Sequence, residues 1–429
     1  MITARGRAAL AAGSVARWGS RLTGRGAGSM IGGLVAMTLD KSILGQLGTG
    51  RRSVVVTGTN GKSTTTRMTA AALRTLGPVA SNTEGSNMDA GLIAALAADR
   101  DAQYAALEVD EMHVPHVADA ISPSVIVLLN LSRDQLDRVG EINHIERTLR
   151  AALARHPAAT IIANCDDVLM TSAAYDCPNV VWVAAGGGWA GDSVSCPRSG
   201  EVIVRDGAGW YSTGTDFKRP DPQWWFDDTQ LYGPDGLTLP MTLSLPGTVN
   251  RGNAAQAVAA AVAMGADPAR AVTAAGAVDE VAGRYRTVQI GPHAVRMLLA
   301  KNPAGWQEAL SMVDTTAAGV VISVNGQVPD GEDLSWLWDV NFEQFVAAGS
   351  TSEERARKRP DAIEPAPSQR LPVVASGERG TDLAVRLGYA GVTHTLVHDP
   401  LAAIASCPPG HVELIANYTA FLQLNRRLP

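Results

Sequence analysis

The stretch that decides the fold is Ser53–Thr64, which reads S-V-V-V-T-G-T-N-G-K-S-T. Its first five residues are a short β-branched run, which predicts a buried strand. Gly58–Ser63 follows as a tight loop, and a helix is expected over Thr64–Leu76, ended by Gly77 and Pro78. A strand, a glycine-rich loop and a helix in this order are what a phosphate-binding loop requires.

The residue types of this loop suit a phosphate ligand. Small residues let backbone N–H groups point at phosphate oxygens, and the start of a helix adds positive potential there. We expect Lys62 to neutralise the outer phosphates and the Ser63 hydroxyl to ligate Mg²⁺. The strict G-x-x-x-x-G-K-[ST] spacing is not met, because Val56 occupies the first glycine position. An ordinary glycine-rich turn with an exposed lysine is the alternative.

The composition excludes several classes of protein. The chain has 429 residues, of which 46% are hydrophobic, enough to bury several cores; this rules out a disordered or fibrous chain. Its 36 basic and 42 acidic side chains give a formal net charge of −6, which argues against a nucleic-acid binder. The sequence contains no run of 18 apolar residues, so a transmembrane helix is not expected. The four cysteines form no C-x-x-C pair, so reduced thiols in a cytoplasm are expected.

Strand-like and helix-like stretches alternate after the loop. A helix is expected over Ile142–Arg155, between two of the strands. The further strands expected here are Ala105–Val109, Val125–Leu129, Thr160–Asn164 and Val180–Val183. This alternation predicts an α/β fold with a mostly parallel sheet covered on both faces.

The pattern divides the chain into three parts. Residues 1–50 predict a helical and glycine-rich segment packed on the central domain. Residues 51–290 predict that central domain, in which residues 185–240, rich in Gly, Asp and Trp, form an inserted β subdomain. Residues 291–429 predict a smaller Rossmann-like α/β domain, with the charged, proline-rich residues 347–370 as a mobile loop.

The N-terminal segment is basic. A targeting peptide is one interpretation, but no compact apolar core with a small-residue cleavage site follows the arginines. A surface helix followed by the glycine-rich loop Gly24–Gly33 is favoured, and a basic helix also suits contact with acidic lipid headgroups. Residues 1–39 contain no acidic residue and five arginines: Arg5, Arg7, Arg17, Arg21 and Arg25.

The T-G-T-N-G-K-S-T loop resembles the nucleotide loop of the Mur ligases and folylpolyglutamate synthases. Other segments resemble motifs of that family in the same order, from about residue 50 to 310. They are Glu84-Gly85-Ser86-Asn87-Met88, Leu107-Glu108-Val109, Asn130 with Asp134-Gln135-Leu136-Asp137-Arg138, Asn164-Cys165-Asp166-Asp167, Leu245 through Ala254, and Gly283-Arg284. The resemblance implies a Mur-ligase-like central ATPase domain that uses ATP and Mg²⁺.

The resemblance also implies roles for individual residues. It places Ser63 and Glu108 at Mg²⁺, Asn87 and Asp134 on the substrate side, and Lys62 and Glu108 among the catalytic residues. The residues it places at ATP are Gly58, Thr59, Asn60, Gly61, Lys62, Ser63, Thr64, Asn250, Asn253, Arg284 and Lys301, with the two later asparagines at adenine. Alternatives remain for some of these residues: Glu108 as a solvated acid, Asn250 and Asn253 as helix N-caps, and Lys301 as a surface lysine.

Departures from the family pattern point to one branch. Gln135 stands where D-H-L-D has histidine, and no lysine lies between Lys62 and Lys218, so the carbamylated lysine that holds a second Mg²⁺ in most Mur ligases is absent. The segments L-A-K-N-P-x-G around Lys301, Asp333–Glu343 and Ser376–Gly391 resemble the MurT family. The resemblance to the MurT family covers nearly the whole chain.

The MurT family is the Mur-ligase-like part of lipid II isoglutaminyl synthase. The resemblance implies an ATP-dependent amide ligase that activates the α-carboxylate of D-glutamate in the peptidoglycan stem peptide as an acyl phosphate and amidates it to D-isoglutamine. It implies a GatD-type glutamine amidotransferase partner, which hydrolyses glutamine and supplies the ammonia. Asp339, with Asp333 as second choice, is the catalytic residue implied to complete the partner's Cys-His pair; a structural cap or surface acid is the alternative.

Further expectations concern metals, location and the insert. Some MurT proteins carry a four-cysteine zinc ribbon in the insert, but Cys196 is its only trace here, so no zinc is expected. The aromatics Trp210, Tyr211, Trp224, Trp225 and Phe226 are expected to form a substitute core or a contact surface. Residues 1–50 leave no room for a UDP-sugar-binding domain, and the chain is expected in the cytoplasm with peripheral contact at the inner face of the cell membrane.

Two other functions stay open at this stage. One is a different Mur-type ligase, such as a folylpolyglutamate synthase that adds an amino acid. The other is a non-catalytic scaffold that binds nucleotide and regulates an amidotransferase. The missing lysine and the C-terminal tryptophan motif count against the first, and the intact phosphate loop with Glu108 counts against the second.

Overall fold

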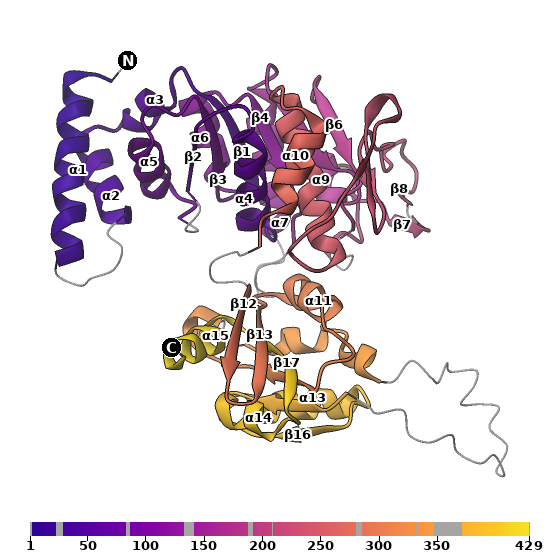
Figure 1. Cartoon of the computed structure of the whole chain (residues 1–429). Helices are drawn as coiled ribbons and strands as arrows, with labels where there is room; N and C mark the ends of the chain where they lie inside the picture. The colour runs from indigo at the N-terminus through magenta and orange to yellow at the C-terminus, as the bar shows by residue number, and fades with distance from the viewer. Residues whose placement is uncertain are drawn as a thin grey trace, which may run out of the picture. The chain divides into compact units, whose positions relative to one another are not determined.

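The structure is a computed structural model, shown in Figure 1. It describes residues 2–22, 29–82, 86–132, 141–187, 192–207, 209–279, 285–330, 333–346 and 371–428. These residues form two compact units, one up to residue 279 and the other from residue 285 onward. The expected mobile loop, residues 347–370, lies outside the described residues.

The first unit is built on a six-stranded parallel sheet with the order β2-β3-β1-β4-β5-β6. Its strands are β1 (Arg52–Thr57), β2 (Val79–Ser81), β3 (Tyr104–Glu108), β4 (Val125–Leu128), β5 (Thr160–Asn164) and β6 (Val180–Val183). The strand order reverses beside β1, which lies between β3 and β4. In open parallel sheets, ligands bind at the carboxyl ends of the strands next to such a reversal.

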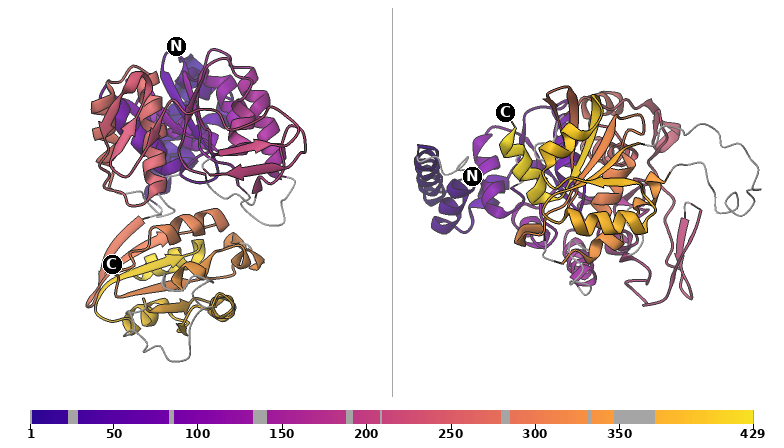
Figure 2. Two further views of the ribbon diagram at one scale, coloured as in Figure 1. Left: turned by 90° about the vertical axis from the view of Figure 1, so that its right-hand side faces the viewer. Right: turned by 90° about the horizontal axis from the view of Figure 1, so that it is seen from below.

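Helices cover both faces of this sheet, as Figures 1 and 2 show. On one face α4 packs against α9 and α10, and on the other α3, α5, α6, α7 and α8 enclose a large apolar core. The helices are α1 (Ala4–Leu22), α2 (Ser29–Leu39), α3 (Ile43–Gly48), α4 (Lys62–Leu73), α5 (Asp89–Ala98), α6 (Val114–Ile121), α7 (Glu141–Ala154), α8 (Val168–Ala174), α9 (Thr248–Ala263) and α10 (Pro268–Gly276).

The expected glycine-rich loop Gly24–Gly33 is wrong from Ser29 onward, because α2 begins there. Gly32 and Gly33 lie within this helix, where a side chain would collide with the backbone of a neighbouring helix. The glycines therefore serve close helix packing and not a flexible connection.

The insert between β6 and α9 contains short antiparallel strands. Trp210 is buried with Cys196, Ile203 and Phe217, whereas Tyr211 is exposed. Likewise, of the two adjacent tryptophans, Trp224 is buried and Trp225 exposed. The aromatics are thus divided between core and surface. The elements are β7 (Ile203–Asp206) paired with β8 (Gly209–Ser212), and β9 (Trp225–Phe226), β10 (Gln230–Tyr232) and β11 (Thr238–Pro240), with the short 3-10 helix η3 (Pro234–Gly236).

The second unit contains a six-stranded mixed sheet with the order β12-β13-β17-β14-β15-β16 and helices on both faces (Figure 2). Its β12 pairs antiparallel with β13 from end to end, so residues up to 290 that the sequence assigned to the central domain lie in this second sheet. The strands are β12 (Tyr285–Ile290), β13 (His293–Leu299), β14 (Gly319–Ser323), β15 (Val373–Ser376), β16 (His394–Leu396) and β17 (Gly410–Ala416).

In the described residues of the second unit, four α-helices and three short 3-10 helices accompany the sheet. They are α11 (Pro303–Ser311), α13 (Gly380–Tyr389), α14 (Pro400–Ser406), α15 (Tyr418–Arg427), η4 (Val328–Asp330), η5 (Ser335–Trp338) and η6 (Phe342–Phe345). Within the described ranges of both units, the helices are all too short or too polar to span a bilayer.

Candidate functional site

The loop between β1 and α4 depends on two glycines. Gly58 and Gly61 have φ angles of +141° and +81°, which side chains other than glycine rarely adopt. A Cβ on Gly58 would lie 2.8 Å from Cβ of Leu129, and a Cβ on Gly61 would lie 2.7 Å from Oδ1 of Asn253. Both positions therefore require glycine for the backbone conformation and for the close packing around the loop.

The loop is held in place by residues that follow β4. The Thr59 N–H donates to the Asn130 carbonyl oxygen at 2.8 Å, and the Asn60 N–H donates to Asn130 Oδ1 at 2.9 Å. In return, Asn130 Nδ2 donates to the Asn60 carbonyl at 3.1 Å. These bonds fix the loop before any ligand arrives, which preorganises its remaining N–H groups.

Lys62 is the first residue of α4, and its ammonium group turns back on the loop. Nζ donates to the Gly58 carbonyl at 2.5 Å and to the Thr59 carbonyl at 3.3 Å. It also forms an ion pair with Glu111, at 3.3 Å from Oε1 and 3.4 Å from Oε2. Both side chains of this pair are only 10% exposed. Lys62 is therefore not the exposed lysine that the alternative of an ordinary turn assumed.

Glu111 is a candidate site residue that no motif in the sequence indicated. It lies between β3 and α6, three positions after Glu108, and belongs to none of the family motifs quoted above. The one signal in the sequence is a second acid so soon after a strand end. β3 pairs with β1, so the segment that carries Glu111 follows the strand next to the one that leads into the Gly58–Ser63 loop.

Glu108 ends β3 opposite Val56, and it is 3% exposed. Its backbone is fixed by the Asn82 side chain, which accepts from the Glu108 N–H and donates to its carbonyl, both at 2.8 Å. Its Oε2 is buried without a hydrogen-bond partner in the described residues. A buried carboxylate oxygen with no donor requires a cation or a proton. The position therefore fits Mg²⁺, which prefers oxygen ligands, and a solvated acid is excluded.

The two asparagines of α9 pack against the loop. Asn253 contacts Gly61 as described, and its Nδ2 donates to Asn250 Oδ1 at 3.2 Å. Asn250 Nδ2 in turn donates to the Pro246 carbonyl. The N-cap of α9 is Gly247, so the alternative that these asparagines cap the helix is wrong.

The other expected site residues are distributed as follows. The Asn87 carbonyl accepts from the Asp110 N–H at 3.1 Å, which places Asn87 beside the segment carrying Glu111. Lys301 lies in the second unit, exposed, with Nζ 5.0 Å from the ring centroid of Tyr418. Asp134 and Arg284 lie outside the described residues.

In the second unit, Asp333 and Asp339 differ in their partners. The Asp333 carboxylate accepts from the Ser335 N–H at 2.8 Å and from its hydroxyl at 3.0 Å, so Asp333 stabilises the start of η5. Asp339 follows η5 and is partly exposed, and within the described ranges no donor bonds its carboxylate. Asp339 is thus available to another molecule, while Asp333 is engaged locally.

Asp167 connects the start of α8 to the segment that follows β4. It caps α8 by accepting from the Met170 N–H at 2.8 Å, and it accepts from the Leu131 N–H at 3.1 Å, beside Asn130. Burial raises the pKa of this carboxyl to about 6. The ionised form therefore lies in a site that favours the neutral form.

This shift predicts a measurable pH dependence of stability. A pKa of about 6 in the folded protein lies above the ordinary value of 3.8, so the stabilising contribution of Asp167 is complete below that value and is lost as the pH rises through 6. Relative to an Asp167→Asn variant, the wild type should lose up to about 3 kcal/mol of unfolding free energy over this range. Urea unfolding at several pH values measures this difference, and a difference that does not change with pH would contradict the expectation.

Comparison with known proteins identifies the class. The Mur ligase middle domain model matches residues 56–261, and the MurT ligase C-terminal model matches residues 299–357. Among solved structures, a pseudomurein peptide ligase type C from Methanothermus fervidus is similar with a TM-score of 0.64, at 17% identity over 88% of this chain and 78% of that one. MurF from Acinetobacter baumannii gives 0.64 and 17% over 91% and 80%. The chain is therefore a Mur-ligase-like protein with the α/β fold of that class.

Within that class, its relatives are more specific. The MurT subunit of lipid II isoglutaminyl synthase (glutamine-hydrolyzing) from Streptococcus pneumoniae is 29% identical over 94% of this chain and 93% of its own length. The MurT subunit from Staphylococcus aureus is 26% identical over 96% of both chains. With the MurT-type C-terminal match, these findings confirm the resemblance to MurT that the sequence motifs predicted.

Proposed function

We propose that this chain is the ATP-dependent amide-ligase subunit of a lipid II isoglutaminyl synthase. The observation that carries the proposal is the buried, unpartnered oxygen of Glu108 on the strand next to the phosphate loop. A preorganised loop and a buried carboxylate that can hold Mg²⁺ are the parts that phosphoryl transfer needs. The names of the similar MurT subunits supply the lipid II substrate and the use of glutamine.

The reaction has to replace a poor leaving group. In the proposed first step, an oxygen of the α-carboxylate of D-glutamate attacks the γ-phosphorus of ATP, ADP leaves, and an acyl phosphate forms. In the second step, ammonia attacks the acyl carbon, inorganic phosphate leaves and a proton is released, which gives the amide of D-isoglutamine. The protein mainly positions the reactants and neutralises charge.

Each proposed site residue has its own part in this reaction. The loop N–H groups and Lys62 would neutralise the phosphates, once Lys62 turns from Glu111 toward them. Ser63 and Glu108 would hold Mg²⁺, which supplies further charge neutralisation when it is bound. Asn250 and Asn253 would contact adenine, and Asn87 and Asp134 would face the substrate. Arg284 and Lys301 are proposed for phosphate or acyl-phosphate oxygens.

The ammonia is proposed to come from a GatD-type glutaminase subunit. Burial raises the pKa of the Cys407 thiol and raises that of Cys165 to about 12, so neither is an activated nucleophile for glutamine hydrolysis. Asp339 would complete the Cys-His pair of the partner by orienting the histidine. Because the substrate is carried on a lipid, the proposal also places the protein in the cytoplasm with peripheral contact at the membrane.

An assay of the chain with its partner, ATP, Mg²⁺ and purified lipid II tests this function. Mass spectrometry should show one carboxyl group of lipid II converted to an amide, with ADP released in proportion and with either glutamine or ammonium as nitrogen source. Addition of an amino acid instead of ammonia would indicate the folylpolyglutamate-synthase-like alternative. Nucleotide binding without turnover, with the partner present, would indicate the scaffold.

The ion pair of Lys62 with Glu111 predicts an effect on nucleotide affinity. In Glu111→Gln the lysine is freed and a negative charge near the phosphates is removed, so Mg²⁺-free ADP should bind about tenfold more tightly, roughly 1.4 kcal/mol. Isothermal titration calorimetry in EDTA measures this. The control is Asp119→Asn on α6, which removes a carboxylate that pairs with Arg155 on the surface and should leave the affinity unchanged. Unchanged or weaker binding by Glu111→Gln would contradict the expectation.

A further inference from the structure

The outer surface of α1 carries an apolar stripe. Val15 is 68% exposed and Trp18 is 66% exposed, and with the exposed Ala11 they recur every three or four residues along one side of the helix. Figures 1 and 2 show α1 at one end of the first unit, with α2 against it. Exposed large apolar side chains grouped in this way indicate a surface that meets another phase or molecule.

α2 also carries exposed apolar side chains. Its Leu34 is 54% exposed, and Met30 and Ile31 on the preceding turn are also exposed. Unlike the side chains of an ordinary surface helix, those of α2 include no charged residue at all. The two helices therefore present apolar side chains on their solvent sides without an acidic group among them.

The opposite sides of the two helices are held rigidly. A Cβ on Gly13 of α1 would lie 2.4 Å from the Gly32 carbonyl oxygen of α2. A Cβ on Gly33 would lie 1.9 Å from the Ala90 carbonyl oxygen of α5. This close backbone packing fixes α1 and α2 to the rest of the first unit. The inner sides of both helices are therefore already packed, and the exposed stripe of α1 is not the side that packs on the first unit.

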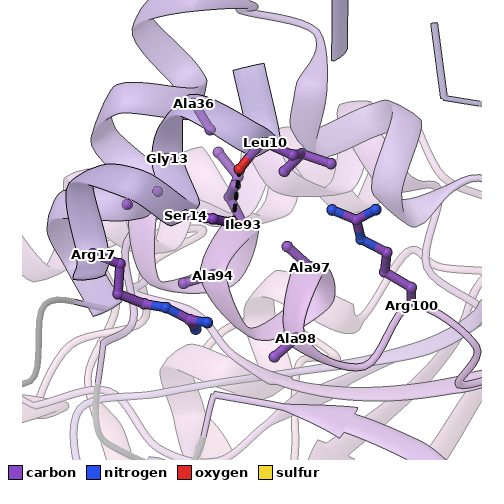
Figure 3. Close-up of a pocket in the computed structure, with 12 residues that line it drawn as sticks. Leu10, Gly13, Ser14, Arg17, Ala36, Ile93, Ala94, Ala97, Ala98 and Arg100 are labelled. Carbon is purple, nitrogen blue, oxygen red and sulfur yellow. Dashed lines mark hydrogen bonds between the residues drawn. The ribbon is translucent and has the colours of Figure 1, made fainter. Parts of the chain in front are cut away.

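The N-terminal segment that contains both helices is rich in positive charge. Residues 1–39 contain five arginines and no acid, although the whole chain has a formal net charge of −6. Arg17 and Arg100 line a pocket between α1, α2 and α5, and Figure 3 shows their side chains on either side of the turn of α5 that carries Ala94, Ala97 and Ala98. No described carboxylate forms an ion pair with either arginine. Both are therefore available to an anion.

From these observations we propose that α1 and α2 dock the protein on an anionic lipid bilayer. Trp18, Val15 and Leu34 would enter the interfacial layer, while Arg17 and Arg100 meet phosphate headgroups, the combination typical of helices that lie in a membrane interface. A nucleic acid matches the arginines but not the apolar stripe. The purpose of the docking rests on the proposed function, because it would bring the ligase site to a lipid-borne substrate. The binding to the bilayer itself does not depend on catalysis.

Cosedimentation of the chain and its partner with lipid vesicles tests the proposal. Binding is expected to vesicles that contain phosphatidylglycerol and not to pure phosphatidylcholine, and it should weaken as salt rises. The double variant Val15→Ser/Trp18→Ser should lower the partition coefficient at least about tenfold. The control is Trp225→Ser, which removes another exposed tryptophan, in the insert, and should leave vesicle binding unchanged.

Other outcomes separate this inference from the proposed function. Lys62→Ala should still bind vesicles. Val15→Ser/Trp18→Ser should amidate lipid II in detergent at the wild-type rate but slow at least about tenfold on vesicle-borne lipid II. Equal binding to both vesicle types, no binding, or an equal loss in Trp225→Ser would overturn the docking proposal, as would a self-association that the double variant abolishes. Failure to amidate in detergent would instead count against the proposed function alone.

Discussion

Lys62→Ala is expected to abolish amidation, with a fall in rate of at least about 10³-fold. Removing a single preorganised donor from a site of developing charge costs on the order of 10²–10³, and Lys62 would carry a full positive charge to the phosphates. The rate of amide formation on lipid II measures this effect. With ammonium as the nitrogen source, the measurement does not involve the partner's glutaminase. A variant that retains more than a tenth of the wild-type rate would contradict the assigned role.

The structure adds a stability effect to this substitution. Glu111 loses its cation in Lys62→Ala, and breaking a buried ion pair by removing one partner costs up to about 3–5 kcal/mol. The value here should lie nearer the lower end, because both side chains keep some exposure.

The matched control is the double variant Lys62→Ala/Glu111→Gln. It removes the orphaned charge, so thermal unfolding should show stability recovered toward the wild type while amidation stays abolished. A double variant that regains activity would show that the single variant had failed by misfolding and not by loss of the catalytic charge.

Asp339→Asn is expected to separate the two nitrogen sources. Glutamine-driven amidation should fall by about 10³–10⁴-fold, since an amide in place of a carboxylate that orients a catalytic histidine favours the wrong tautomer. Amidation with added ammonium should stay at the wild-type rate, because that route bypasses glutamine hydrolysis. Both rates are measured on the complex with its partner.

Asp333→Asn is the control for this prediction. It makes the same chemical change in the same segment, but the Asp333 carboxylate is engaged by Ser335 at the start of η5. It should alter the two nitrogen sources equally and only slightly. Equal loss with both sources in Asp339→Asn would contradict the assignment, and a selective loss in Asp333→Asn would transfer the role to that residue.

The local sequence was enough to predict many of the strands and helices of the first unit. The run Ser53–Thr57 is β-branched and is followed by glycines and a lysine, so strand, loop and helix are each specified by neighbours in the chain, and β1 and α4 form there. The helix nevertheless begins at Lys62 and ends at Leu73, a little before the expected bounds, because Gly61 adopts the left-handed conformation directly before it.

Contacts between residues that are far apart in the sequence cannot be predicted from neighbours in the chain. The ion pair of Glu111 with Lys62 spans 49 positions, and it forms because β3 and β1 are neighbours in space although β2 separates them in sequence. For the same reason, Asn253 is next to Gly61 only through the packing of α9 on α4.

The sequence by itself thus determined the strand, glycine-containing loop and helix from Arg52 to Leu73, the alternation of strands and helices and the MurT-type motifs, because each of these depends on the chemistry of adjacent residues. Tertiary structure alone decided which carboxylates are buried, which aromatics of the insert are exposed, that β12 joins the second sheet, and that α2 continues through Gly32 and Gly33. Burial and pairing depend on what other parts of the chain bring to a residue, and a single stretch of sequence does not contain that information.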